Sequence, residues 1–126
     1  LPEHMDFSSS VIPYTKAVEV VLHRQVFEPF RNSHTEGDCR NSFLQAFMRG
    51  EKDLTLGSYM IILSSSRETA LRNFMGRSLS DVEGMVTILN DVSMRDVRNK
   101  AAHDEVLTRD EARQARTWAL GILGMV

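Results

Sequence analysis

The spacing of apolar residues is the feature that most constrains the fold of this chain. Tyr14 is followed by apolar side chains three, four, seven and eight positions later, at Ala17, Val18, Val21 and Leu22. Residues spaced in this way lie on one face of an α-helix, which has about 3.6 residues per turn. Similar spacing returns in four later sets: Phe43, Leu44, Phe47 and Met48; Ala70, Leu71 and Phe74; Val82, Met85, Val86, Leu89 and Val92; and Ala112, Ala115, Ala119, Leu123 and Val126. We therefore predict an all-α protein, a bundle of about five or six helices.

Prolines and glycines predict where these helices begin and end. Pro13 suits the first turn of the first helix, where its missing amide proton costs nothing. Pro29 predicts that the same helix ends or kinks, because proline removes a backbone donor. Gly50 is placed to end the second helix, and Gly76 to end a helix over residues 67–75.

Residues 54–63 could form either a strand or a helix. Their β-branched and aromatic side chains suit a strand, but a single strand among helices would have no partner. We therefore expect a short buried helix that starts at Gly57 or Ser58.

Two capping boxes are expected before the later helices, at residues 80–83 and 108–111, because each pairs a Ser or Thr with a Glu three positions on. Residues 90–94 predict a kink, since Asn and Ser side chains compete with helical hydrogen bonds. The next helix is expected to continue from about Arg95.

Length and charge limit the possible classes of protein. The 126 residues suit one domain, over residues 6–126, and residues 1–5 resemble a cloning-vector remnant because of the His-Met pair. The net charge of −2 argues against extended nucleic-acid binding but leaves room for a small cleft that grips a few phosphates.

The cysteine and histidine content predicts a cytoplasmic protein without a metal or other cofactor. Cys39 is the only cysteine, so no intramolecular disulfide can form, and no base adjacent in sequence would activate it as a nucleophile. The four histidines show no paired ligand spacing. No apolar run reaches the roughly 20 residues of a membrane span, and we find no secretory leader.

The candidate site is the hexapeptide Arg98-Asn99-Lys100-Ala101-Ala102-His103. On a helix Asn99 and His103 share a face, whereas Arg98 and His103, five positions apart, do not. Arg98 and His103 could converge if the helix ends or bends near His103, or if a second copy of the motif faces the first. The small side chains of Ala101 and Ala102 would allow such a close approach.

These residue types fit metal-independent RNA cleavage. His103 would handle the proton of the ribose 2′-hydroxyl, since an imidazole pKa near 6.5 suits that task. Arg98 would stabilise the charge on the phosphorane, and Asn99 would hold the phosphate or orient the imidazole. The alternative is that Arg98 and His103 only cap and solvate the end of a helix.

The chain resembles HEPN domains over nearly its whole length. The likeness is carried by Asp6-Phe7-Ser8 leading into Tyr14, Ala17 and Glu19; by Leu54-Thr55-Leu56-Gly57; by the Arg-x4-His motif from Arg98 to His103; and by the capped helix after it. The resemblance implies a homodimer with a composite site from the two motifs. It also implies an endoribonuclease for unpaired RNA, such as a tRNA loop. The implied setting is bacterial defence or a toxin, with an antitoxin or a fused sensor domain as a possible partner.

Three further cations, Lys100, Arg95 and Arg109, are expected to contact the RNA. The position two residues after the motif histidine is Glu105, where nucleotidyltransferase-paired HEPN toxins carry a tyrosine, so the resemblance does not extend to regulation by AMP transfer. The alternative function is a non-catalytic HEPN-like dimerisation or sensing module of a larger protein.

Residues outside the motif are expected to have other roles. His23 is expected at the surface of the first helix. Glu19 lies beside the apolar stripe, where it could pair with a cation of another helix and support the motif. Arg109, Arg113 and Arg116 line the polar side of the last helix, and Trp118 is expected in the core or in a dimer contact.

Overall fold

The computed structural model describes residues 8–79, 81–102 and 107–125. Within these ranges the chain forms α-helices with no strand, which confirms the all-α prediction, although the helices are more numerous than expected. The elements are α1 (Ser8–Leu22), a π-helical turn (His23–Phe27), α2 (Glu28–Ser33), a 3-10 turn (Glu36–Asp38), α3 (Ser42–Met48), α4 (Leu56–Ser64), α5 (Thr69–Ser78), α6 (Val82–Leu89), α7 (Val92–Ala102) and α8 (Arg109–Leu123).

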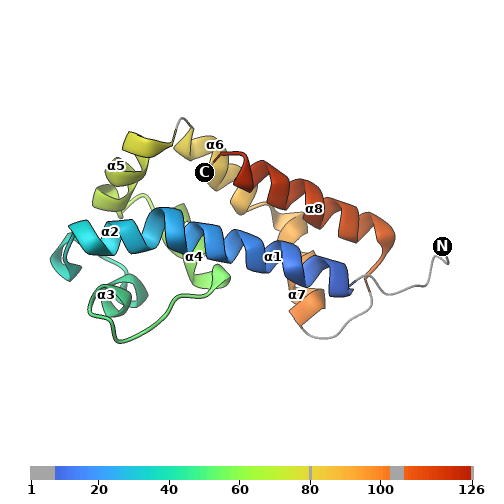
Figure 1. The fold of residues 1–126 in the computed structure, drawn as a ribbon, viewed down its shortest axis with the longest axis horizontal. Helices are drawn as coiled ribbons and strands as arrows, with labels where there is room; N and C mark the ends of the chain where they lie inside the picture. The colour runs from blue at the N-terminus through green and yellow to red at the C-terminus, as the bar shows by residue number, and fades with distance from the viewer. Residues whose placement is uncertain (1–7, 80, 103–106, 126) are drawn as a thin grey trace.

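The helices are arranged around a long rod made of α1 and α2. Figure 1 shows α8 beside α1, while α3 and α5 lie at the opposite end, near α2. α1 packs against α8, α7 and α4, and α8 also packs against α6 and α7. The packing of α8 uses the predicted alanines Ala112, Ala115 and Ala119, which are buried together with Trp118 and Ile122. Leu123 is only partly buried, and Val126 lies outside the described residues.

The helical run does not end at Pro29, which was one of the two predicted outcomes, because helix continues past this residue to Ser33. The helical run passes through the π turn, in which the Glu28 amide donates to the carbonyl of His23, five residues back. Pro29 then lies in the first turn of α2, where its missing donor is tolerated. The run ends only at Ser33.

Pro13 is not in the first turn as predicted, because α1 already begins at Ser8. A proline inside a helix removes one backbone hydrogen bond. The contacts of α1 with α8, α7 and α4 compensate for that loss, since tertiary packing supplies most of the stability of a protein helix.

Glycines and caps account for the other helix ends. Gly50 follows α3 with a φ of 76°, a left-handed conformation that favours glycine, as predicted. Gly76 does not end its helix, because α5 continues to Ser78 while Met75 and Leu79 remain packed against the core. α4 is a helix as expected, but it begins at Leu56, with the Thr55 side chain accepting from the Ser58 amide.

Of the two predicted capping boxes, the one before α8 is confirmed, and the one before α6 falls partly outside the described residues. Asp81 caps α6 by accepting from the Gly84 amide at 2.8 Å, whereas the expected cap, Ser80, lies outside the described residues. The capping box of α8 is confirmed: the Glu111 amide donates to Thr108 Oγ1, and the Thr108 amide donates to Glu111 Oε1, each at 3.1 Å.

The predicted kink before the motif helix is a full break between two helices. Asn90 follows α6 and its side-chain amide donates to the carbonyl of Val86 at 3.0 Å. α7 starts at Val92, three residues before the expected Arg95.

The core beneath α2 is aromatic. Phe27 of the π turn stacks on Tyr59 of α4, with ring centroids 4.3 Å apart and an interplanar angle of 28°. Phe47 of α3 meets the edge of Phe27 at 6.3 Å. Phe27, Phe30 and Phe47 are fully buried, and the ring contacts of Phe27 join the π turn to α3 and α4. None of the helices in the described ranges is long and apolar enough to span a lipid bilayer.

Candidate functional site

The motif begins in the second half of α7. Arg98, Asn99 and Lys100 belong to this helix, and Asn99 is exposed. The side chain of Arg98 and all of His103 lie outside the described residues. Whether Arg98 and His103 converge therefore remains a prediction.

An ion pair fixes this part of α7 against α8. Lys100 Nζ lies 2.9 Å from Glu111 Oε2, and Glu111 is in the first turn of α8. Burial raises the pKa of Glu111, but hydrogen bonds from Lys100 and Thr108 outweigh this effect, so the pKa lies below its ordinary value. Lys100 is bound to Glu111, so an RNA phosphate that contacted Lys100 would have to share its ammonium group with this carboxylate.

Replacing Glu111 by alanine is expected to lower the free energy of unfolding by about 1–2 kcal/mol, through loss of both the capping box and the ion pair. The folded pKa of Glu111 is lowered, so its contribution is present above its ordinary pKa and is lost as the pH falls through the folded pKa. Urea unfolding at pH 7 and at pH 3 would measure both effects.

Glu83→Ala is the matched control for this substitution. Glu83 is also in the first turn of its helix and pairs with Arg72 at 2.6 Å, but its side chain is 84% exposed. We expect this variant to lose less than about 0.5 kcal/mol. Equal losses for the two variants would show that Glu111 does not fasten α7 to α8.

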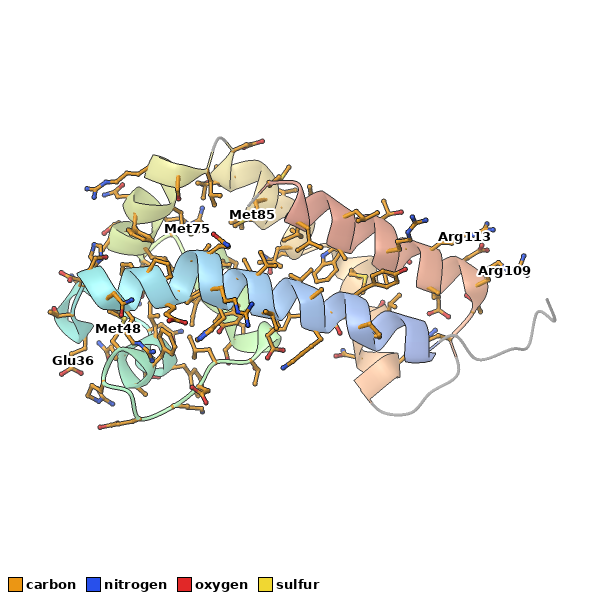
Figure 2. All side chains as sticks on the ribbon, in the orientation of Figure 1. Glu36, Met48, Met75, Met85, Arg109 and Arg113 are labelled. Atoms are coloured by element: carbon orange, nitrogen blue, oxygen red, sulfur yellow. The ribbon has the colours of Figure 1, made fainter. Side chains whose placement is uncertain are left out.

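The other predicted RNA contacts, Arg95 and Arg109, belong to different helices, α7 and α8. Arg95 lines a cleft of about 300 Å³ between α7 and α4, together with Asn90, Met60 and Ile61. Arg109 begins α8, and Figure 2 shows Arg109 and Arg113 projecting away from the bundle. Arg95 and Lys100 are five positions apart on α7 and therefore point in different directions.

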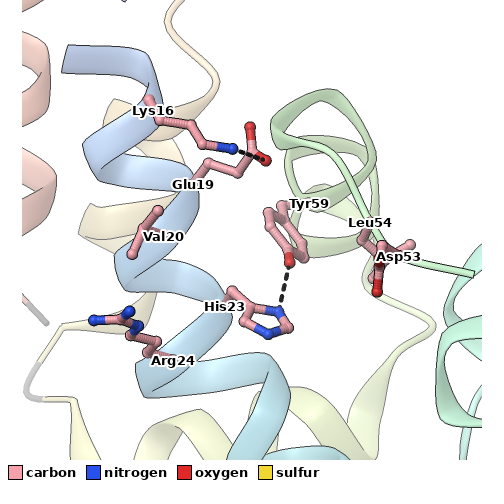
Figure 3. A pocket seen from close by; sticks show the side chains of 8 residues that line it. All are labelled: Lys16, Glu19, Val20, His23, Arg24, Asp53, Leu54 and Tyr59. Atoms are coloured by element: carbon pink, nitrogen blue, oxygen red, sulfur yellow. Dashed lines mark hydrogen bonds and ion pairs between the residues drawn. The ribbon is translucent and has the colours of Figure 1, made fainter. Parts of the chain in front are cut away.

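A second group of polar residues lies in a pocket of about 330 Å³ between α1, the π turn and the segment that leads into α4 (Figure 3). His23, expected at the surface, is partly buried here. Its Nδ1 lies 3.1 Å from the Tyr59 hydroxyl, and its Nε2 lies 3.3 Å from Glu28 Oε2. The His23 ring also meets the edge of Phe47 at 6.0 Å.

The ring of His23 lies between a hydroxyl and a carboxylate. Which ring nitrogen carries the proton decides whether Nδ1 donates to the Tyr59 hydroxyl or accepts from it. Burial, with the charges of Glu19 and Asp53, raises the pKa of Tyr59 to about 12, so the phenol keeps its proton at neutral pH and is not a nucleophile.

The remaining candidates for nucleophilic or metal chemistry are few. Cys39 is buried, and burial, followed by the charges of Glu68 and Asp38, raises the pKa of its thiol to about 11. Thiolate, the reactive form, is therefore scarce at neutral pH. In the ranges 8–79, 81–102 and 107–125, no three His, Cys, Asp or Glu side chains gather in a way that could hold a metal ion.

No protein-family model, curated protein or solved structure matches this chain significantly. The resemblance to HEPN domains therefore rests on the residues named above.

Proposed function

We propose that this protein is a metal-independent endoribonuclease that cleaves unpaired RNA. Arg98, Asn99 and His103 of two copies would form a composite site. The main support is the Lys100–Glu111 ion pair, because it holds the motif helix against the start of α8. Asn99 is exposed on this part of α7, and Arg109 at the start of α8 is exposed as well. An amide donor and a cation for phosphate thus lie on two helices that pack together.

The proposed reaction is an in-line attack within the RNA strand. The ribose 2′-oxygen attacks the adjacent phosphorus while its proton passes to His103. The bond to the 5′-oxygen breaks, and that oxygen takes up a proton, which leaves a 2′,3′-cyclic phosphate and a 5′-hydroxyl end. Arg98 stabilises the negative charge on the phosphorane oxygens, and Asn99 holds the phosphate.

The proposal includes a homodimer, because residues five apart on one helix do not face each other. We place this dimer in the cytoplasm, in a bacterial defence or toxin setting, with an antitoxin or a fused sensor domain as the partner that restrains it.

A second candidate function is a dimerisation or sensing module without catalysis. It is favoured by apolar surface on α8, where Leu120 is 55% exposed. The same helix contributes Trp118 and Gly121 to a mainly apolar cavity of about 430 Å³, whose lining also includes Ile88, Met94, Asp91, Gln114 and Thr117. Such a surface fits another protein chain better than it fits RNA.

Cleavage assays in EDTA separate the two functions. The parent, His103→Ala and Arg98→Ala would be compared on an unpaired RNA and on a tRNA pool, with fragment ends analysed for cyclic phosphate. We expect the parent to cleave and each substitution to lower the rate at least about 100-fold. Arg77→Ala, at an exposed position in α5, is the control for loss of an arginine and should retain the parent rate.

Absence of cleavage by a folded, dimeric parent would contradict the nuclease and favour the module. Cleavage that survives both motif substitutions would also contradict the proposed site, and would point to a contaminating nuclease. Sedimentation of each variant shows whether it remains dimeric.

A further inference from the structure

Three arginines, Arg109, Arg113 and Arg116, form a row on the outer face of α8. We propose that this arginine row holds the phosphate backbone of an RNA strand outside the cleaving motif. Arg109 is already a predicted RNA contact, and Arg113 and Arg116 extend the contact along the helix. The choice of RNA over other polyanions rests on the proposed function.

The side chains of the arginine row leave α8 on one side. With about 100° between successive helical residues, the three positions lie within an arc of about 60°. The buried side of the same helix carries Ala112 and Ala115. All three arginines are exposed, and Figure 2 shows Arg109 and Arg113 pointing away from the bundle. The row extends about 10 Å along the helix axis, at about 1.5 Å per residue.

No ion pair within the described part of the chain neutralises the arginine row. The ion pairs between described residues include none of its guanidinium groups. Of the two acidic residues in α8, Glu111 is bound to Lys100, and Asp110 is exposed beside the row without an ion pair to it. The row is therefore a positive surface on a chain whose net charge is −2.

The stability of α8 does not account for this arrangement. Arg109 lies in the first turn of α8, where the helix dipole favours an anion and disfavours a cation. Arg109 and Arg113 are four positions apart, and Arg113 and Arg116 are three apart, so neighbouring like charges repel each other. An anion bound between these side chains would reduce both unfavourable effects.

The chemistry of the arginine row fits a strand of phosphates. The forked N–H donors of a guanidinium group can bind two oxygens of one phosphate. A row of such groups matches a linear polyanion, because a nucleic acid strand presents one phosphate per nucleotide and is followed along its backbone by basic side chains. We therefore expect contacts to successive phosphates, without selection of the base sequence.

The test measures binding of the whole protein to a fluorescently labelled, unpaired 2′-O-methyl RNA of about 12 nucleotides, by fluorescence anisotropy in EDTA. The 2′-O-methyl group removes the nucleophile of the proposed cleavage, so binding is measured whether or not the protein is a nuclease. The titration is repeated over a range of salt concentrations. Each phosphate contact to a single strand contributes about 0.7 to the slope of log Kd against log salt concentration.

Substitutions locate the binding. Arg113→Gln and Arg116→Gln should each raise the Kd at least about threefold and lower the salt slope by about 0.7, and changing the whole row to glutamine should lower the slope by about 2. The matched control changes Arg24, Arg67 and Arg77 to glutamine, which removes the same charge from exposed positions on other elements. Its slope should equal that of the parent. Circular dichroism checks the fold of each variant.

Three outcomes would overturn the proposal. The first is the absence of binding by the folded parent. The second is an equal loss of affinity for the two triple variants, which would show that only the net charge of the protein matters. The third is competition by poly-L-glutamate as strong as that by unlabelled RNA of equal charge, which would favour an acidic protein partner. Binding that depends on the row without cleavage of ordinary RNA would support this inference and contradict the nuclease.

Discussion

Substitution of Glu68 by alanine is expected to lower the free energy of unfolding by about 3–5 kcal/mol. Glu68 is the buried charged residue in the described part of the chain, at 1% exposure. Its Oε1 accepts from the backbone amides of Arg40 and Asn41, each at 2.7 Å. Truncation would leave both donors without their partner, at a cost of about 1–3 kcal/mol each. Urea unfolding followed by circular dichroism at pH 7 measures the loss.

Glu68→Gln is the control for the role of this acceptor. The amide oxygen of glutamine can still accept both backbone hydrogen bonds, so we expect less than half of the loss seen with alanine. If glutamine and alanine destabilise the protein equally, then the negative charge, and not the pair of hydrogen bonds, carries the effect. If neither destabilises it, the contact between this carboxylate and the start of α3 contributes nothing to stability.

Substitution of Phe27 by alanine is expected to cost about 3–5 kcal/mol, because a buried phenylalanine loses its transfer free energy and leaves a cavity. Phe27 is fully buried and contacts both Tyr59 and Phe47 through their rings. It also belongs to the π turn, so its ring contacts hold this turn against α3 and α4. The measurement is again urea unfolding, with the m-value as a check that the unfolded state is unchanged.

Phe43→Ala is the matched control for loss of an aromatic ring. Phe43 is 46% exposed on α3, and Lys52 Nζ lies 4.3 Å from its ring centroid. We expect a loss below about 1 kcal/mol, from a solvent-exposed cation–π contact and little buried area. If Phe27→Ala costs no more than Phe43→Ala, the ring contacts of Phe27 are not the main link between the π turn, α3 and α4.

The helices were predictable because their signals are local. The apolar spacing that starts at Tyr14, the glycine after α3 and the capping box before α8 each depend on residues within a few positions of one another. Pro29 and Gly76 were misjudged for the opposite reason. Packing and a π turn carry the helix through Pro29, and α5 passes Gly76 to keep its later residues on the core.

The two candidate sites also differ in whether the sequence alone could predict them. The motif from Arg98 to His103 can be read from sequence, because its chemistry lies in one short segment. The His23 pocket cannot, since Tyr59 is 36 residues away from His23 in the chain. The sequence could have suggested a contact between His23 and Glu28, but residues five positions apart on a regular helix do not face each other. The π turn between α1 and α2 spans these residues, and His23 and Glu28 form an ion-pair contact across it.

The sequence by itself therefore determined the all-α class and most of the helices, because helix periodicity and caps act over a few residues. RNA cleavage stays a prediction from the motif. Only the tertiary structure decided that Glu68 binds the backbone before α3, that Lys100 is paired with Glu111 of α8, and that His23 and Tyr59 line the same pocket. Each of these contacts joins side chains distant in sequence, or requires burial. The free energies of these contacts depend on tertiary packing, which cannot be predicted from residues that are close in sequence.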